Sequence, residues 1–216
     1  MGFSNLEAIK RGFARLKEDP LTIAGITLVA LIYWVVPFYI TRFVLGVNQF
    51  LGAMLVLAIL PVWFLVLMGY IKSMLDVHDG KIAGLADLFL HYDKLPDFLI
   101  CFIFYLISVL VSMLFLVVPG IFLAVKFSFS LFFILQGELS AIKALKRSWK
   151  ITGDNFFNLL IFYLILIIMN LFGFLFFLLG LVVTLPVTAI AVIFAYRKLS
   201  YDYNKKEISS LKVDNL

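Results

Sequence analysis

A single lysine inside a long apolar stretch is the first residue whose position could carry chemistry. Lys126 is the only Asp, Glu, Lys or Arg between Phe98 and Gly137. An ionisable residue inside a membrane span is costly, so it is a functional-site candidate by default. The alternative is structural, because a lysine near an outer turn can extend its side chain to the outer headgroups. No carboxylate lies inside an apolar stretch, so a proton relay would lack its acidic partner.

Other polar residues are predicted to lie at a similar depth. The apolar stretches before and after Lys126 are expected to reverse at Pro119-Gly120, which places Ser112 level with the lysine. Small and hydroxylated faces let membrane helices pack closely and hydrogen-bond, and the same groups could hold a ligand or an anion. The hypothetical intramembrane polar layer consists of Lys126, Ser112, Ser130, Asn170 and Thr188.

A basic segment follows and forms a second candidate site. Within residues 138–154, the apolar side chains Ile142, Leu145 and Trp149 are predicted on one side of a helix. Such a helix is expected to lie in the headgroup region with its cations toward anionic lipid. The lipid-surface cations on its other side are Lys143, Lys146, Arg147 and Lys150.

Two more surface segments are predicted. Residues 4–19 form an amphipathic helix capped by Ser4, which is either a lipid or partner contact or a topology anchor. Residues 75–97 are expected to hold a short helix capped by Asp79. His78 and His91 lie in this segment among aspartates, but their spacing matches no ligand pattern, so no metal site is predicted.

The sequence carries no catalytic signature. It lacks HExxH, GxSxG and a Gly-rich phosphate loop, so we expect neither an enzyme nor a cofactor. A pI of about 9.3 is also typical of nucleic-acid binding. Here the basic residues flank apolar stretches, so the anionic leaflet is the nearer partner and no nucleic-acid partner is predicted.

Composition places the chain in a bilayer. Hydrophobic residues make up 64% of it and charged residues 14%, which leaves too little polar surface for a soluble domain. The apolar stretches predict an all-α, polytopic integral membrane protein with six transmembrane helices and cytoplasmic amphipathic surface helices. Four spans are predicted at 21–45, 50–74, 98–118 and 121–136. The uncharged stretch 155–196 is long enough for two more, with a reversal at Gly180.

The placement of positive charge predicts the orientation. All 18 lysines and arginines except Arg42 and Lys126 fall in segments on one predicted side. The positive-inside rule then puts both termini in the cytoplasm, as expected for a multi-pass protein of the cell (inner) membrane. The predicted domains are an N-terminal surface helix at 1–20, a transmembrane domain at 21–199 and a partly disordered cytoplasmic tail at 200–216.

The stretch from residue 115 to 196 resembles a bacterial membrane-protein family. A Pro-Gly-Ile turn precedes a basic residue in a helix, an acid at its end, and an Ala-Leu-x-x-Ser segment leading to Gly. This pattern is similar to the membrane domain fused to some glycerophosphoryl diester phosphodiesterases, and to its stand-alone relatives. The phosphodiesterase catalytic domain is absent, so the resemblance implies a six-helix membrane protein and no such activity. The matching residues are Pro119, Gly120, Ile121, Lys126, Glu138, Ala144, Leu145, Ser148 and Gly153.

These observations predict a non-enzymatic membrane protein. It would organise or bind membrane lipids, or a protein partner that could be a second copy of itself, at the cytoplasmic face. The alternative is a small transporter or channel that uses the polar layer around Lys126.

Overall fold

The computed structural model describes residues 3–90, 92–137 and 140–213, which fold into α-helices with short 3₁₀ segments. Helix α1 (Asn5–Glu18) begins where predicted, because the Ser4 hydroxyl accepts from the Glu7 amide at 3.4 Å. Asp19 ends α1 and caps the next helix by accepting from the Thr22 amide at 3.2 Å. That helix, α2 (Pro20–Val47), starts on a proline, whose missing N–H costs nothing in a first turn.

Six helical segments within the described ranges are long and apolar enough to cross a membrane. They contain 19 to 31 residues, which gives them lengths of about 28–46 Å against a hydrocarbon core of about 30 Å. The prediction of an all-α polytopic membrane protein is therefore confirmed. The segments are Pro20–Val47, Gln49–His78, Leu95–Phe115, Val117–Leu135, Gly153–Leu175 and Leu179–Ser209.

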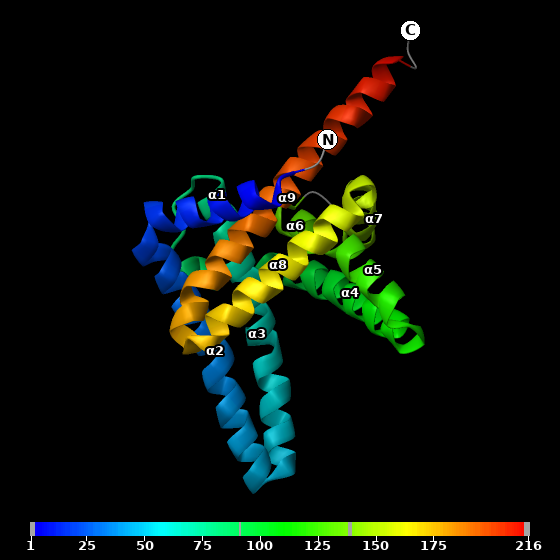
Figure 1. Ribbon diagram of the computed structural model, residues 1–216. Helices are drawn as coiled ribbons and strands as arrows, with labels where there is room; N and C mark the ends of the chain where they lie inside the picture. Colours follow the sequence, from blue (N-terminus) through cyan, green and yellow to red (C-terminus); the bar gives the residue numbers. More distant parts are fainter. Residues whose placement is uncertain (1–2, 91, 138–139, 214–216) are drawn as a thin grey trace.

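The spans form three hairpins with tight tips. Helices α2 and α3 (Gln49–His78) join at Asn48, whose side chain accepts from the first amides of α3. Helices α4 (Leu95–Phe115) and α5 (Val117–Phe127) join at Leu116. Helices α8 (Phe156–Leu175) and α9 (Phe177–Val213) join at Phe176. Figure 1 shows the three tips pointing away from one another.

Two predicted reversals are displaced. Pro119 and Gly120 lie in the first turn of α5, where proline is tolerated because that N–H has no helical partner. Gly120 instead lets α5 approach Met113 of α4. Gly180 lies inside α9, and a Cβ there would collide with the carbonyl of Gly173 in α8. Both glycines therefore serve close helix contact, and the reversals fall a few residues earlier in the chain.

The buried side chains gather at the end opposite the tips. Tyr196 of α9 is 1% exposed, and its ring lies 5.1 to 5.7 Å from those of Phe129, Phe132 and Phe133. Side chains at the tips are exposed, Leu114 by 85% and Phe176 by 74%. The hairpins thus share one core at their open ends and separate toward their tips (Figure 1).

The open end also carries the surface segments, and we call it the polar end. It comprises α1, residues 79–90 and 92–94, helix α7 (Ala141–Ile151) and the part of α9 beyond Tyr196 (Figure 1). The connection 79–94 holds two 3₁₀ turns, η1 (Leu85–Leu88) and η2 (Tyr92–Lys94).

The C-terminal tail differs from the prediction. Residues 200–213 continue α9 as helix and project away from the molecule in Figure 1. The predicted boundary at 199/200 therefore falls inside one continuous helix. Side-chain pairs with neighbouring elements, described below, hold this extension in place.

Candidate functional site

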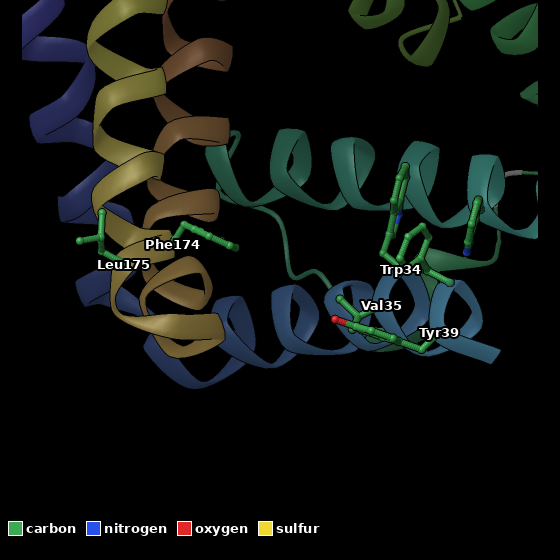
Figure 2. A pocket seen from close by; sticks show the side chains of 7 residues that line it. Trp34, Val35, Tyr39, Phe174 and Leu175 are labelled. Atoms are coloured by element: carbon green, nitrogen blue, oxygen red, sulfur yellow. The ribbon is translucent and has the colours of Figure 1, made fainter. Parts of the chain in front are cut away.

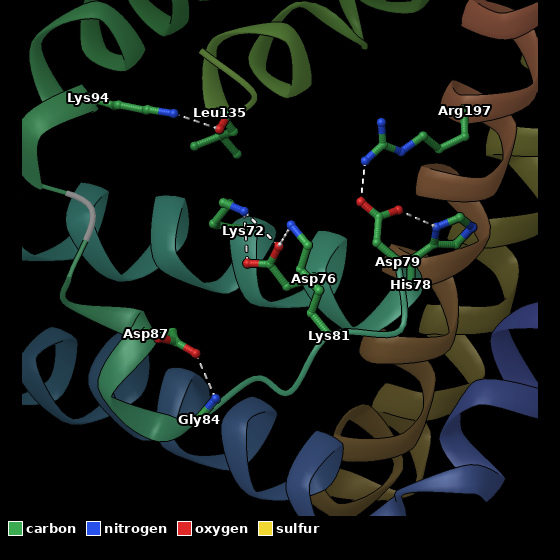
Figure 3. A network of polar contacts seen from close by, with 10 residues as sticks. All are labelled: Lys72, Asp76, His78, Asp79, Lys81, Gly84, Asp87, Lys94, Leu135 and Arg197. Atoms are coloured by element: carbon green, nitrogen blue, oxygen red, sulfur yellow. Dashed lines mark hydrogen bonds and ion pairs between the residues drawn. The ribbon is translucent and has the colours of Figure 1, made fainter.

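Ion pairs and hydrogen bonds join the surface segments at the polar end (Figure 3). Arg197 of α9 forms an ion pair with Asp79 at the end of α3, and Asp79 also lies 3.2 Å from His78 Nδ1. Lys94 donates to the carbonyl of Leu135 at 3.1 Å. The prediction that Asp79 caps the following short helix is wrong, because Asp79 ends α3 and its carboxylate turns toward α9.

The extension of α9 is held by two further elements. Arg147 of α7 pairs with Glu207 at 3.3 Å and also donates to Asn204. Lys206 pairs with Asp154 of η3 (Gly153–Asn155) at 2.8 Å. Arg147 is therefore paired within the protein, unlike Lys143, Lys146 and Lys150, with which it was grouped as a lipid-surface cation.

Helix α7 presents three faces. Ala141, Ala144, Ser148 and Ile151 are buried against the protein, and this face of α7, small except for Ile151, was not predicted from the sequence. Ile142 and Trp149 are exposed, by 58% and 41%. The cations Lys143, Lys146 and Lys150 are also exposed, and no ion pair is recorded for them within the described ranges.

Lys126 lies at the polar end rather than near a tip. Its ammonium is 5.2 Å from the Trp149 ring and 5.3 Å from the Phe122 ring, and a Cβ on Gly153 would lie 3.9 Å from it. The residue is 6% exposed. The expectation that the side chain reaches the outer headgroups is wrong. The tip lies at Leu116, ten residues earlier, and α5 ends at Phe127, so Lys126 already faces α7.

The fourth span is broken just after Lys126. Helix α5 ends at Phe127 and α6 (Ser130–Leu135) begins three residues later. The break frees backbone groups that the apolar interior cannot satisfy. Ser148 of α7 donates to the Lys126 carbonyl at 2.7 Å and accepts from the Phe129 amide at 3.2 Å. Thr152 donates to the same carbonyl at 3.3 Å.

The predicted polar layer separates into distinct places. Ser130 lies at the break, where its hydroxyl donates to the Phe127 carbonyl at 2.7 Å. Asn170 and Thr188 do meet, with the amide Nδ2 donating to the hydroxyl at 3.2 Å. The Lys126 ammonium lies beside Gly153, close to the start of α8. Asn170 is fourteen residues farther along α8, so Lys126 and Asn170 are roughly 21 Å apart in the direction of that helix.

Ser112 belongs to neither place. The contact between Gly120 and Met113 sets the register of α4 against α5 and puts Ser112 opposite the first turn of α5. Lys126 is in the last turn of that helix. The layer was predicted from a reversal at Pro119-Gly120, and the earlier reversal at Leu116 moves Ser112 toward the tip.

Of the two histidines for which no metal site was predicted, the structure describes only His78. His91 lies outside the described residues. Among those described, no three His, Cys, Asp or Glu side chains are grouped to hold a metal ion. His78 has its ring nitrogen beside Asp79, as above.

Comparison of the chain with protein-family models, with curated proteins and with solved structures finds no match. The resemblance to the membrane domain of the phosphodiesterases therefore stays a prediction, and the site has to be interpreted from its own geometry.

Proposed function

We propose that this protein is a non-enzymatic component of the cell (inner) membrane that binds anionic lipid headgroups at its cytoplasmic face through α7. The polar end would be the cytoplasmic end, because nearly all cations of the sequence lie in the segments gathered there. The termini would then both be cytoplasmic.

One observation carries this proposal. On α7, exposed lysines stand beside exposed apolar side chains, while the third face of the helix is occupied by the protein. Lys143, Lys146 and Lys150 can reach phosphates while Ile142 and Trp149 enter the acyl boundary, which is the arrangement of an interfacial helix. Each lysine near an anionic surface contributes about 1 kcal/mol of attraction.

Trp149 gives the proposal a direct readout. The variant Trp34→Phe/Trp63→Phe leaves Trp149 as the only tryptophan. We reconstitute it in phosphatidylcholine vesicles with a small fraction of brominated phosphatidylglycerol, or with the same fraction of brominated phosphatidylcholine. Bromine quenches only nearby tryptophan, so we expect stronger quenching by the anionic lipid.

The lysines are then tested with a charge-matched control. Lys143→Gln/Lys146→Gln should remove most of the preference for phosphatidylglycerol, about fivefold for each lysine near the surface. Lys198→Gln/Lys205→Gln removes the same charge from exposed positions on α9 and should retain the preference. Equal quenching by both lipids, or equal loss in both variants, contradicts the proposal.

A further inference from the structure

The Lys126 ammonium is a buried charge whose hydrogen-bond donors are unpaired. The residue is 6% exposed, and within the described ranges its ammonium forms no ion pair and no hydrogen bond. The rings of Phe122 and Trp149 attract the charge, but they offer no lone pairs to its three N–H groups. A buried charge without acceptors is costly, so an anion beside Lys126 would be stabilising.

The start of the fifth span adds positive potential at the same place. This span begins at Gly153, where a Cβ would lie 3.9 Å from the Lys126 ammonium. The first amides of a helix have no partner within it and carry a partial positive charge. Thr152 and Asn155, which precede η3 and α8, make no side-chain cap bond there. A buried cation and an uncapped helix start therefore meet at Gly153, and both favour a negative group.

The acidic residue in this first turn does not neutralise the ammonium. Asp154 pairs with Lys206 at 2.8 Å, and its own side chain is 77% exposed. It attracts the Lys126 ammonium from beyond ion-pair distance. The charge of Lys126 is therefore only partly balanced by the described part of the chain.

The surroundings of the ammonium suit the chains of a lipid. Gly153 is exposed and Trp149 is partly exposed, so the place opens at the surface of the protein. The Phe122 ring lies 4.9 Å from the Phe156 ring, which lies 5.3 Å from that of the exposed Phe157. These rings form an apolar path from the ammonium to the outer surface of α8, along which an acyl chain can lie.

An apolar cleft elsewhere in the molecule lacks such a charge. It has a volume of about 760 Å³ and lies between the α2/α3 and α8/α9 hairpins, where Trp34, Tyr39 and Phe174 line it (Figure 2). The described residues of its lining are uncharged. Bulk acyl chains can fill this cleft, so it does not select a headgroup.

We infer that Lys126 and the start of the fifth span bind the phosphate of one anionic phospholipid, whose acyl chain lies against Phe156 and Phe157. The inference deepens the proposed function and rests on it, because α7 has to lie among the headgroups for a phosphate to reach Lys126. The exposed lysines of α7 attract anionic lipid without selecting a molecule, whereas the buried ammonium holds one. A headgroup without a cation of its own is preferred, since those lysines repel a second positive charge.

The test counts lipids on the full-length protein by native mass spectrometry in dodecyl maltoside. Dioleoylphosphatidylglycerol should bind first as a single molecule, at a concentration at least about tenfold below that of further molecules, because a hydrogen bond to a charged group holds it. Two competitors separate the parts of the ligand. Dioleoylglycerol lacks the phosphate and glycerol 3-phosphate lacks the chains, so each should displace the first lipid at least about tenfold less well than the whole phospholipid.

A charge-matched pair of variants tests Lys126. Lys126→Gln should raise the concentration for half-occupancy of this first site at least about tenfold, as expected for the loss of a hydrogen bond to a charged group. Lys198→Gln removes the same charge from an exposed position on α9 and should leave the half-occupancy concentration unchanged.

Gly153→Asp supplies an internal competitor and keeps the test valid if Lys126→Gln fails to fold. A Cβ at this position lies at ordinary contact distance from the ammonium, so the new carboxylate can pair with Lys126 in place of a phosphate. Gly153→Asp should weaken binding of the first lipid at least about tenfold, and Gly153→Asn, of the same shape without the charge, should retain it. The lipid-free unfolding temperature of Gly153→Asp should not fall below that of Gly153→Asn.

Several outcomes overturn the inference. They are the absence of a single first lipid, equal occupancy in Lys126→Gln and Lys198→Gln, and a first lipid held equally by Gly153→Asp and Gly153→Asn. Displacement by glycerol 3-phosphate as effective as by the phospholipid would assign the site to soluble phosphate esters. Equally effective displacement by dioleoylglycerol would mean apolar packing only.

The proposed function fails or stands by a different measurement, the quenching of Trp149 in vesicles. A preference for phosphatidylglycerol in vesicles, together with equal occupancy in Lys126→Gln and Lys198→Gln, overturns only the bound lipid at Lys126. A first lipid that depends on Lys126, without any preference in vesicles, contradicts only the role of the exposed lysines of α7.

Discussion

At the scale of single residues, Ser148 explains how a membrane span can be interrupted. Its hydroxyl is fully buried, and it both donates to the Lys126 carbonyl and accepts from the Phe129 amide. One side chain of α7 thereby replaces backbone hydrogen bonds that the break in the fourth span removes. Because Ser148 belongs to α7, these hydrogen bonds attach α7 to the fourth span in addition to the packing between them.

Replacing Ser148 with alanine should therefore destabilise the protein. The substitution leaves the buried Phe129 amide without an acceptor and removes one of the two donors to the Lys126 carbonyl. Each buried polar group left unsatisfied costs about 1–3 kcal/mol. We expect a clear fall in the unfolding temperature of the purified protein in detergent. Ser140→Ala is the matched control, since Ser140 is exposed and makes no side-chain cap bond. Equal unfolding temperatures for the two variants would contradict this role.

Sequence reasoning located these residues but not their partners. Lys126 was identified because a lone charge in apolar sequence is visible without a structure. Its position beside α7 could not be predicted, because the helix breaks after Phe127 at a place where the sequence has neither proline nor glycine. Asn170 and Thr188 were both placed in the predicted layer around Lys126, but their hydrogen bond to each other was not predicted.

At the scale of elements, close contacts through glycine set how the helices cross. Gly173 and Gly180 bring α8 and α9 together, and a Cβ on Gly173 would also collide with the side chain of Thr184. Gly12 does the same between α1 and α9, where a Cβ would meet the carbonyl of Val187. Membrane helices lack a hydrophobic drive to associate, so such close approaches supply van der Waals contact instead. Helix α1 is thus docked to the sixth span, beyond its predicted role at the membrane surface.

A methyl group at Gly180 should disrupt the α8/α9 contact. Gly180→Ala places a Cβ against backbone, which cannot move aside as a flexible side chain would, and such overpacking costs about 1–3 kcal/mol. Gly25→Ala in α2 adds the same methyl where no atom lies within 4 Å, so it should be tolerated. Thermal unfolding of both variants in the same detergent checks this. A Gly180→Ala protein as stable as Gly25→Ala would rule out the close contact.

At the scale of the whole molecule, the three hairpins converge at the polar end and diverge at their tips (Figure 1). The alternation of charged and apolar segments predicted this grouping, because six crossings return every basic segment to one side. The spread of the tips could not be predicted, since exposed leucine and phenylalanine at a tip look the same in sequence as buried ones. Ion pairs from α9 to α3, α7 and η3 hold the polar end together.

Cysteine accessibility tests the orientation of the whole arrangement. Single cysteines are introduced at the tips, Asn48→Cys and Phe176→Cys, and at the polar end, Lys81→Cys and Lys143→Cys. The background is Cys101→Ala, which removes the one native, buried cysteine. A membrane-impermeant maleimide applied to intact cells should label the tip positions and reach the polar-end positions only after the cells are opened. Labelling of Lys81→Cys and Lys143→Cys in intact cells, with the tips protected, would contradict the account.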